Sequence, residues 1–305
     1  MRRIGVGQRL ILVFIALVTA GAVVFYLRPV ECARQMLYLR LALSGVKSGS
    51  VLVGGHRMHY DAVGPEGGAP VVLVHGLGGH AEDWINLAPF LTRAGYRVYL
   101  PDLPGFGRSE QPKDFSYSIP DQAEAVCGFM DAMGVKQVDL GGWSMGGWIV
   151  QQIAAKHPQR VKRLLLFDSA GLSVRPDWDT ALFTPKNAGE LEQLEKLLMP
   201  VPPKAPGFIA TDMLRASDEN AWVVRRALDS MLTGKDVTDT MLPELKMAVL
   251  LVWGELDRVT PVSLGEKMHG LIPQSQLEVF PGCGHLAPAQ CADKLGPKVA
   301  EFLHE

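Results

Sequence analysis

The chain is poor in the features that mark several large classes of protein. Its 305 residues include four cysteines (Cys32, Cys127, Cys283 and Cys291), with neither metal-ligand spacing nor a dense disulfide framework. We expect Cys283 and Cys291 to be incidental or core thiols rather than ligands. The net charge of −2 and the lack of an RNA- or DNA-binding signature argue against nucleic acid as a partner. No internal repeat is present, so no repeat architecture is expected.

Nucleotide-binding motifs are also missing. The glycine-rich segment His75-Gly76-Leu77-Gly78-Gly79 lacks the Gly-Lys-Ser/Thr ending of a phosphate loop, and it contains no G-x-G-x-x-G pattern. It follows a continuous apolar run at 70–74, which is typical of a buried strand. Bare backbone N–H groups at such a place suit an oxyanion hole instead. The sequence implies no metal and no organic cofactor.

The amino terminus carries a long apolar run. Residues 10–27 hold no charge, and as a helix they would span about 27 Å, close to the thickness of a bilayer core. The segment 1–9 is basic, and Arg28 closes the run. A cleaved signal peptide with a site at Ala20-Gly21-Ala22 is the alternative, but the apolar run continues beyond that site. Length and flanks favour a retained single-pass transmembrane anchor.

The residues around this run say less about topology. Positive charges lie on both sides of it, so the positive-inside rule discriminates little between the two orientations. The segment 31–46 mixes leucines with Arg34 and Arg40, which predicts a juxtamembrane helix at the lipid surface or, alternatively, an ordinary connecting helix. The pattern Ala16-x-x-x-Ala20 permits close helix pairing, so a homodimer through the transmembrane and juxtamembrane region is a further hypothesis.

Beyond residue 50, apolar runs alternate with helical patterns. This rhythm predicts an α/β fold with a mostly parallel sheet and helices on both faces. Prolines cluster with helical patterns between strand-like runs, which predicts an inserted helical lid. The predicted organisation is an anchor at 1–28, a juxtamembrane helix or linker at 29–50, a core at 51–172 and 247–305, and a lid at 173–246.

A nucleophile pattern lies in the middle of the core. Gly142-x-Ser144-x-Gly146 follows a strand-like run at 136–140 and precedes a helical pattern at 148–157. A serine hydroxyl is a poor nucleophile at neutral pH and must be presented to a base. A sharp strand-to-helix turn presents it, and the flanking glycines remove side chains that would collide there.

Five motifs together carry a family resemblance. The chain resembles the α/β-hydrolase superfamily in motifs that occur in its order over about residues 55–303: His75-Gly76, Asp102-x-Pro104-Gly105-x-Gly107-x-Ser109, Gly142-x-Ser144-x-Gly146, Gly254-x-x-Asp257-x-Val259-x-Pro261 and Gly284-His285. A membrane helix ahead of a lidded domain is similar to membrane-anchored monoacylglycerol lipases and to bacterial membrane-bound lysophospholipases and phospholipases. The resemblance implies the α/β-hydrolase fold and, for the cell, an inner-membrane anchor with the periplasmic side slightly favoured.

The resemblance also implies roles for single residues. Ser144 would be the nucleophile, His285 the base and Asp257 the acid that orients it. The backbone N–H groups of Leu77 and Met145 would form the oxyanion hole, and Gly76 and Trp143 would contact the substrate. Asp168 and Glu255 are alternatives for the acid. We expect His75 to structure its loop, and six other histidines to be surface or structural residues: His56, His59, His80, His157, His269 and His304.

The expected reaction is hydrolysis of a carboxylic ester. The anchor favours lipid substrates (monoacylglycerol, lysophospholipid or phospholipid, with short acyl esters also accepted), so the bilayer and a lipid ester are the expected partners. A serine hydrolase of a soluble non-lipid substrate, either a C–C hydrolase or a general carboxylesterase, is the alternative. A non-catalytic binding protein on the same fold is a further one.

Overall fold

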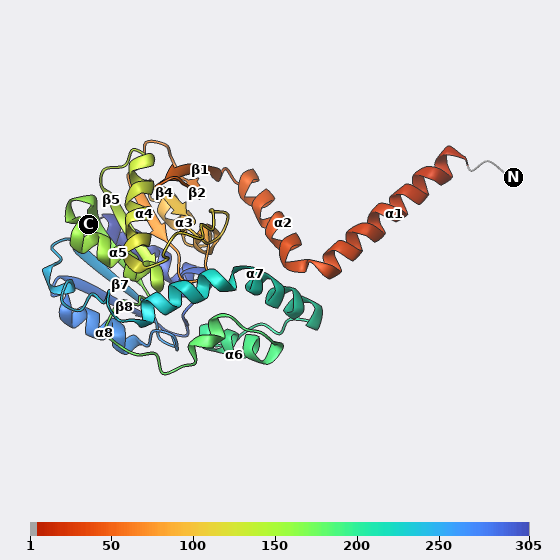
Figure 1. Cartoon of the computed structure of the whole chain (residues 1–305). Helices are drawn as coiled ribbons and strands as arrows, with labels where there is room; N and C mark the ends of the chain where they lie inside the picture. The colour runs from red at the N-terminus through yellow and green to blue at the C-terminus, as the bar shows by residue number, and fades with distance from the viewer. Residues whose placement is uncertain (1–4, 305) are drawn as a thin grey trace.

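An eight-stranded sheet forms the centre of the computed structural model, which describes residues 5–304 (Figure 1). Arg2 and Arg3 of the predicted basic segment lie outside the described residues. The strand order is β1-β2-β4-β3-β5-β6-β7-β8; β2 pairs antiparallel with β1 and β4, and the other pairs are parallel. The strands are β1 (Lys47–Val53), β2 (His56–Val63), β3 (Pro70–Val74), β4 (Arg97–Pro101), β5 (Val138–Trp143), β6 (Val161–Phe167), β7 (Ala248–Gly254) and β8 (Ser275–Phe280).

The central strands are apolar along their whole length because both of their faces are covered. In β3, Val72 and Val74 pack into the core on one face, and Val71 and Leu73 pack into the core on the other. One core includes side chains of α4 (Ile119–Ala132), α5 (Met145–Lys156) and α8 (Val262–Leu271), and the other includes those of α3 (Ala88–Arg93) and α10 (Ala292–His304). The predicted α/β-hydrolase fold, a mostly parallel sheet between helices, is confirmed.

The segment between β6 and β7 contains two α-helices. They are α6 (Ala188–Leu198) and α7 (Gly207–Leu232). The sequence predicts only the part of α7 from residue 220 onward, and the helix begins 13 residues earlier. Its buried apolar residues, such as Ala221 and Leu228, all follow that point, whereas the first half buries only Asp212. The first half packs against α1 and α2 instead of the core, and its helical spacing of Ile209, Met213 and Ala216 is a signal that the prediction from the sequence misses.

The first helix projects from the rest of the molecule in Figure 1, whereas the second runs back to β1 and packs against α7. Helix α1 (Val6–Leu27) is long and apolar enough to cross a membrane and has no buried residue. Arg28 interrupts the helix, and Pro29 begins α2 (Pro29–Leu43), a position that proline tolerates because it needs no N–H partner there. Strand β1 begins at Lys47, inside the range 29–50 that the sequence assigns to a linker.

Aromatic rings join α1 to α7. Phe208, at the start of α7, stacks on Tyr26 with centroids 5.1 Å apart and meets Phe25 edge-on at 6.3 Å. The backbone N–H of Val30 donates to Oδ2 of the buried Asp212 at 2.9 Å. The first turn of α2 is therefore fixed to the lid helix as well as to α1.

The expectation that Cys283 and Cys291 are free thiols is wrong. The two residues form a disulfide, with their Cα atoms 6.2 Å apart. The short helix α9 (Ala287–Gln290) turns the chain back between them, and Cys291 N–H donates to Ala287 O at its end. Cys32 and Cys127 are free.

Candidate active site

Ser144 occupies a sharp turn between β5 and α5. Its backbone has φ 55° and ψ −118°, a strained conformation for a residue with a side chain. The turn is possible because its neighbours are glycines. A Cβ on Gly142 would lie 2.2 Å from Gly146 O, and one on Gly146 would lie 2.2 Å from Val74 O. The sequence predicts this elbow. The predicted strand ends at 140 and the predicted helix begins at 148, whereas in the structure β5 runs to Trp143 and α5 begins at Met145.

His285 and Asp257 meet at the carboxyl ends of β8 and β7. Nδ1 of His285 lies 2.8 Å from Oδ2 of Asp257, and both residues are buried. A carboxylate only accepts hydrogen bonds, so Nδ1 donates to Asp257, and Nε2 is the ring nitrogen left for other partners. Trp143, the residue before Ser144, donates its indole N–H to His285 O at 2.7 Å. Ser144 and His285 line one cavity.

The carboxylate of Asp257 is well supplied with donors. Its Oδ1 accepts the N–H groups of Val259 at 2.7 Å and Thr260 at 3.0 Å, and its Oδ2 accepts the Thr260 hydroxyl at 2.7 Å. Burial acts to raise the pKa of Asp257, but the charge of His285 and these hydrogen bonds outweigh it and hold the pKa below the ordinary value. Asp257 is therefore ionised at neutral pH.

The two alternatives for the acid lie elsewhere. Asp168 follows β6 and uses its Oδ1 to accept Gly254 N–H at 2.7 Å, with no hydrogen bond to His285 among the described residues. Glu255 is exposed and accepts Gly282 N–H at 3.0 Å. Among the three carboxyls considered, Asp257 is the one that the fold places against His285.

The segment proposed for the oxyanion hole lies beside the serine. A Cβ on Gly76 would be 3.2 Å from Cβ of Ser144, so this loop passes close to the proposed nucleophile. Leu77 follows it and lines the cavity. Met145 is the first residue of α5, where a helix N–H has no acceptor within the helix. Leu77 and Met145 therefore lie beside Ser144 in the chain or in the cavity, and their N–H groups remain the candidates for an oxyanion hole.

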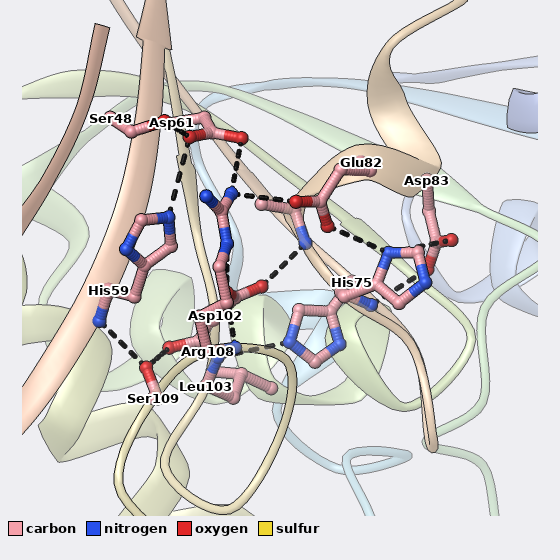
Figure 2. A network of polar contacts seen from close by, with 12 residues as sticks. Ser48, His59, Asp61, His75, Glu82, Asp83, Asp102, Leu103, Arg108 and Ser109 are labelled. Atoms are coloured by element: carbon pink, nitrogen blue, oxygen red, sulfur yellow. Dashed lines mark hydrogen bonds and ion pairs between the residues drawn. The ribbon is translucent and has the colours of Figure 1, made fainter. Parts of the chain in front are cut away.

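His75 fixes the loop that contains Gly76. Its Nε2 accepts Leu103 N–H at 3.0 Å (Figure 2). Its Nδ1 donates to Gly76 O at 2.8 Å, so both ring nitrogens are used. Burial lowers its pKa to about 4, and the ring is neutral. His75 structures its loop, as the sequence predicts.

A network of charged groups borders the same cavity (Figure 2). Arg108 donates from Nη2 to Asp61 at 2.8 Å and to Glu82 at 2.6 Å. His80 lies 3.0 Å from Glu82; burial acts to lower the pKa of His80, but Glu82 and Asp83 raise it to about 9. Tyr38 of α2 covers the Arg108 guanidinium, 4.4 Å from ring centroid to carbon. Helix α2 is therefore docked on this network.

The cavity has a volume of about 720 Å³ and three kinds of wall. The first carries Ser144, His285, Gly76, Leu77 and Trp143. The second is apolar and comes mainly from the lid and its surroundings: Phe183, Leu194, Leu198, Val224 and Leu286. The third is polar and comes from α2: Glu31, Arg34, Gln35 and Tyr38. The sequence predicts the first wall and suggests the second; the contribution of α2 carries no motif.

Comparison with known proteins places the chain in a family. Residues 69–190 match the family model of the alpha/beta hydrolase fold. The chain is 31% identical over 270 residues to 2-hydroxy-6-oxo-6-phenylhexa-2,4-dienoate hydrolase of Burkholderia cepacia, covering 81% of this chain and 91% of the relative. The chain belongs to the α/β-hydrolase family. Since its relatives are hydrolases, it is a hydrolase as well.

Two further similarities concern lipid enzymes. Lipase 1 of Psychrobacter immobilis is 27% identical over 271 residues, which is 82% of either chain. The crystal structure of a membrane phospholipase A, described as a bacterial virulence factor, superimposes with a TM-score of 0.83 at 28% identity and covers 97% of this chain and 98% of that one. The resemblance to lipases and phospholipases predicted from the sequence is confirmed.

Proposed function

We propose that this protein is a membrane-anchored serine hydrolase that cleaves carboxylic esters of lipids. The substrates would be monoacylglycerols, lysophospholipids or phospholipids, with short acyl esters also accepted. One observation carries the proposal: the cavity above Ser144 has an apolar wall that fits an acyl chain and a polar wall that fits a headgroup. The polar wall belongs to α2, which continues from the apolar helix α1.

The proposed mechanism uses the residues that border this cavity. His285 Nε2 takes the proton of Ser144 Oγ as the oxygen attacks the ester carbonyl, and Asp257 stabilises the resulting imidazolium. Leu77 and Met145 donate N–H groups to the oxyanion. His285 then gives its proton to the leaving alcohol, and the acyl group stays on Ser144. Water, deprotonated by His285, releases the fatty acid and restores the serine.

The anchoring and its orientation belong to the same proposal. The contacts of Phe208 with Phe25 and Tyr26 support a retained α1 rather than a cleaved signal peptide. Disulfides persist in oxidising compartments, so the pair Cys283–Cys291 supports a catalytic domain on the periplasmic side of a bacterial inner membrane. Helix α1 exposes all of its described residues, including Ala16 and Ala20, and the proposal includes a homodimer through this helix.

Substitution of the nucleophile tests the chemistry. Ser144→Ala in the full-length, detergent-solubilised protein should reduce turnover of p-nitrophenyl butyrate and of monoacylglycerol at least about a thousandfold. A fluorophosphonate probe should label the native chain and leave the variant unlabelled. Full activity in Ser144→Ala would remove this serine from the mechanism, and a native chain that resists the probe would favour a non-catalytic role.

A second candidate function has its own support. The similarity to the Burkholderia hydrolase, whose name gives a phenylhexadienoate as substrate, favours C–C hydrolysis of a soluble compound. Turnover of that compound can be compared with turnover of p-nitrophenyl esters from acetate to palmitate. A preference for medium or long chains supports the lipid ester, whereas turnover of the dienoate without any chain-length preference supports the second candidate.

A further inference from the structure

A buried carboxyl next to the proposed catalytic acid has no role in the mechanism above. Asp168 follows β6, is fully buried and has φ 41°, a conformation that residues other than glycine rarely adopt. Its N–H donates to Val252 O at 2.9 Å, and its Oδ1 accepts Gly254 N–H at 2.7 Å. No donor among residues 5–304 reaches its Oδ2. An unpaired, fully buried carboxyl oxygen is costly unless the group is neutral.

The nearest partner of Asp168 is another carboxyl. The Thr260 hydroxyl joins the two residues, since it lies 2.9 Å from the backbone oxygen of Asp168 and 2.7 Å from Oδ2 of Asp257. Two buried carboxyls that are neighbours disfavour double ionisation, so the pair favours a state that holds one proton. Burial and, after it, the charge of Asp257 raise the pKa of Asp168 well above the ordinary value, whereas the pKa of Asp257 is lowered by His285 and its hydrogen bonds. The proton of the pair therefore resides on Asp168.

The neighbouring hydrogen-bond donors do not satisfy every acceptor around Asp168 and Asp257. The Thr260 hydroxyl lies 2.7 Å from Asp257 Oδ2 but also 2.9 Å from the backbone oxygen of Asp168, and it has one hydrogen to give. Asp257 is the charged group that acts directly on Asp168, and His285 is the charged group that acts on Asp257. A carboxylic acid at Asp168 would give Asp257 a second side-chain donor that does not depend on Thr260.

We propose that Asp168 is a positioning residue, a neutral carboxylic acid whose O–H donates to the carboxylate of Asp257. This inference rests on the proposed function, because it assumes that Asp257 orients His285. The donated hydrogen bond stabilises the ionised form of Asp257 and fixes its plane toward Nδ1 of His285. During turnover it keeps the proton on the imidazolium, since Asp257 becomes a weaker base.

A pair of substitutions separates this role from simple packing. Asp168→Asn retains a neutral donor and tolerates positive φ, whereas Asp168→Ala removes the donor. We expect Asp168→Ala to lower kcat for p-nitrophenyl butyrate about tenfold with little change in KM, and Asp168→Asn to restore most of it. The acidic limb of the kcat/KM profile reports the free base. The acidic limb should move to higher pH in Asp168→Ala, because Asp257 loses a donor and stabilises the imidazolium more strongly. It should stay in place in Asp168→Asn.

An ionised Asp168 predicts the opposite for the amide variant. Removal of a negative charge beside the triad would move the acidic limb of Asp168→Asn to lower pH, and that result would overturn the proposal. An Asp168→Ala variant with native kcat and an unmoved limb would overturn it as well. Asp139→Asn is the matched control: Asp139 is a buried aspartate at the other end of β5, paired with Arg163, and the same change there should leave the limb in place.

Infrared spectroscopy covers the case in which Asp168→Ala does not fold. The native full-length protein should show the C=O stretch of a protonated carboxylic acid that is lost in Asp168→Asn and persists in Asp139→Asn. An unchanged spectrum in Asp168→Asn would reject the neutral acid. This band does not depend on the substrate. Loss of the proposed lipid activity would leave it intact, and an active Ser144→Ala variant would refute the mechanism without affecting it.

Discussion

The indole N–H of Trp143 donates to the backbone carbonyl of His285 at 2.7 Å. The residue before Ser144 therefore holds the loop that carries His285. The two rings are also in contact, with centroids 5.5 Å apart. This hydrogen bond joins the end of β5 to the loop after β8. The position of the loop that carries His285 therefore depends on the side chain of Trp143, which also lines the cavity.

Trp143→Phe should separate this hydrogen bond from the ring contact. The variant keeps an aromatic ring but leaves His285 O without its donor, a loss that costs about 1–3 kcal/mol for a buried group. We expect kcat for p-nitrophenyl butyrate to fall about tenfold. Trp148→Phe is the control, because Trp148 makes the same kind of bond to Asp236 O at 2.7 Å but does not line the cavity. Equal effects of the two variants on kcat would show that the bond acts only on stability.

The disulfide should make the activity sensitive to reduction. The bond between Cys283 and Cys291 closes a short loop around His285, and such a closure contributes about 2–3 kcal/mol by restricting the unfolded chain. Cys283→Ser combined with Cys291→Ser should lower the thermal midpoint and kcat, and dithiothreitol should reproduce the loss in the native protein only. Cys32→Ser, which removes a free thiol, serves as the control. Native activity after reduction proven by thiol alkylation and mass measurement would contradict this prediction.

His75 should contribute a pH-dependent part of the stability. Its pKa is 6.5 in the unfolded chain and about 4 in the folded one, because burial disfavours the charged ring. Between these values the unfolded chain binds a proton that the native state does not. Its contribution is therefore complete above pH 6.5 and falls by about 3 kcal/mol as the pH drops to 4.

His75→Gln removes this titration and keeps a hydrogen-bonding side chain. The difference in the free energy of unfolding between the native protein and the variant should shrink by about 3 kcal/mol from pH 7 to pH 4, measured by urea unfolding in detergent. Burial raises the pKa of Asp102 to about 6, which gives a trend of opposite sign, but this group is present in both proteins. Parallel stability curves of the two proteins would contradict the prediction.

The elbow should tolerate no side chain at its second glycine. Gly146→Ala would bring a Cβ within 2.2 Å of the Val74 backbone oxygen, which cannot move without breaking the sheet. We expect a loss of about 3 kcal/mol or more, seen as a lower thermal midpoint or as insoluble protein. Gly270→Ala in α8 is the control: nothing lies within 4 Å of its added Cβ, and helix propensity predicts a gain of about 0.5–1 kcal/mol.

The sequence predicts the sheet and the three proposed catalytic residues because local patterns carry them. Continuous apolar runs such as Leu164–Leu166 reflect burial on two faces, and Ser144, Asp257 and His285 each lie in a motif at a strand end. Parallel strands deliver their carboxyl ends to one edge, so the three residues meet there. The topology thus follows from signals that extend over only a few residues.

Other parts of the site depend on tertiary contacts that leave no local pattern. The disulfide requires the short helix α9, because eight extended residues would separate Cys283 from Cys291 by about 26 Å. Tyr38 reaches the cavity because α2 docks on Arg108, and Asp168 meets Asp257 because β6 and β7 are neighbours. Sequence reasoning names Asp168 as an alternative acid but assigns neither of these contacts.

Helix α2 is at once a wall of the cavity and the continuation of the apolar helix. A shortened fragment that starts at β1 would dissolve more readily, but it would lose Glu31, Arg34, Gln35 and Tyr38 from the wall and leave Asp212 without the Val30 N–H. Without this wall the cavity at Ser144 would be open to solvent on one side. Kinetic constants from such a fragment would describe a cavity with a different lining. Selectivity for substrate headgroups therefore has to be measured on the intact chain.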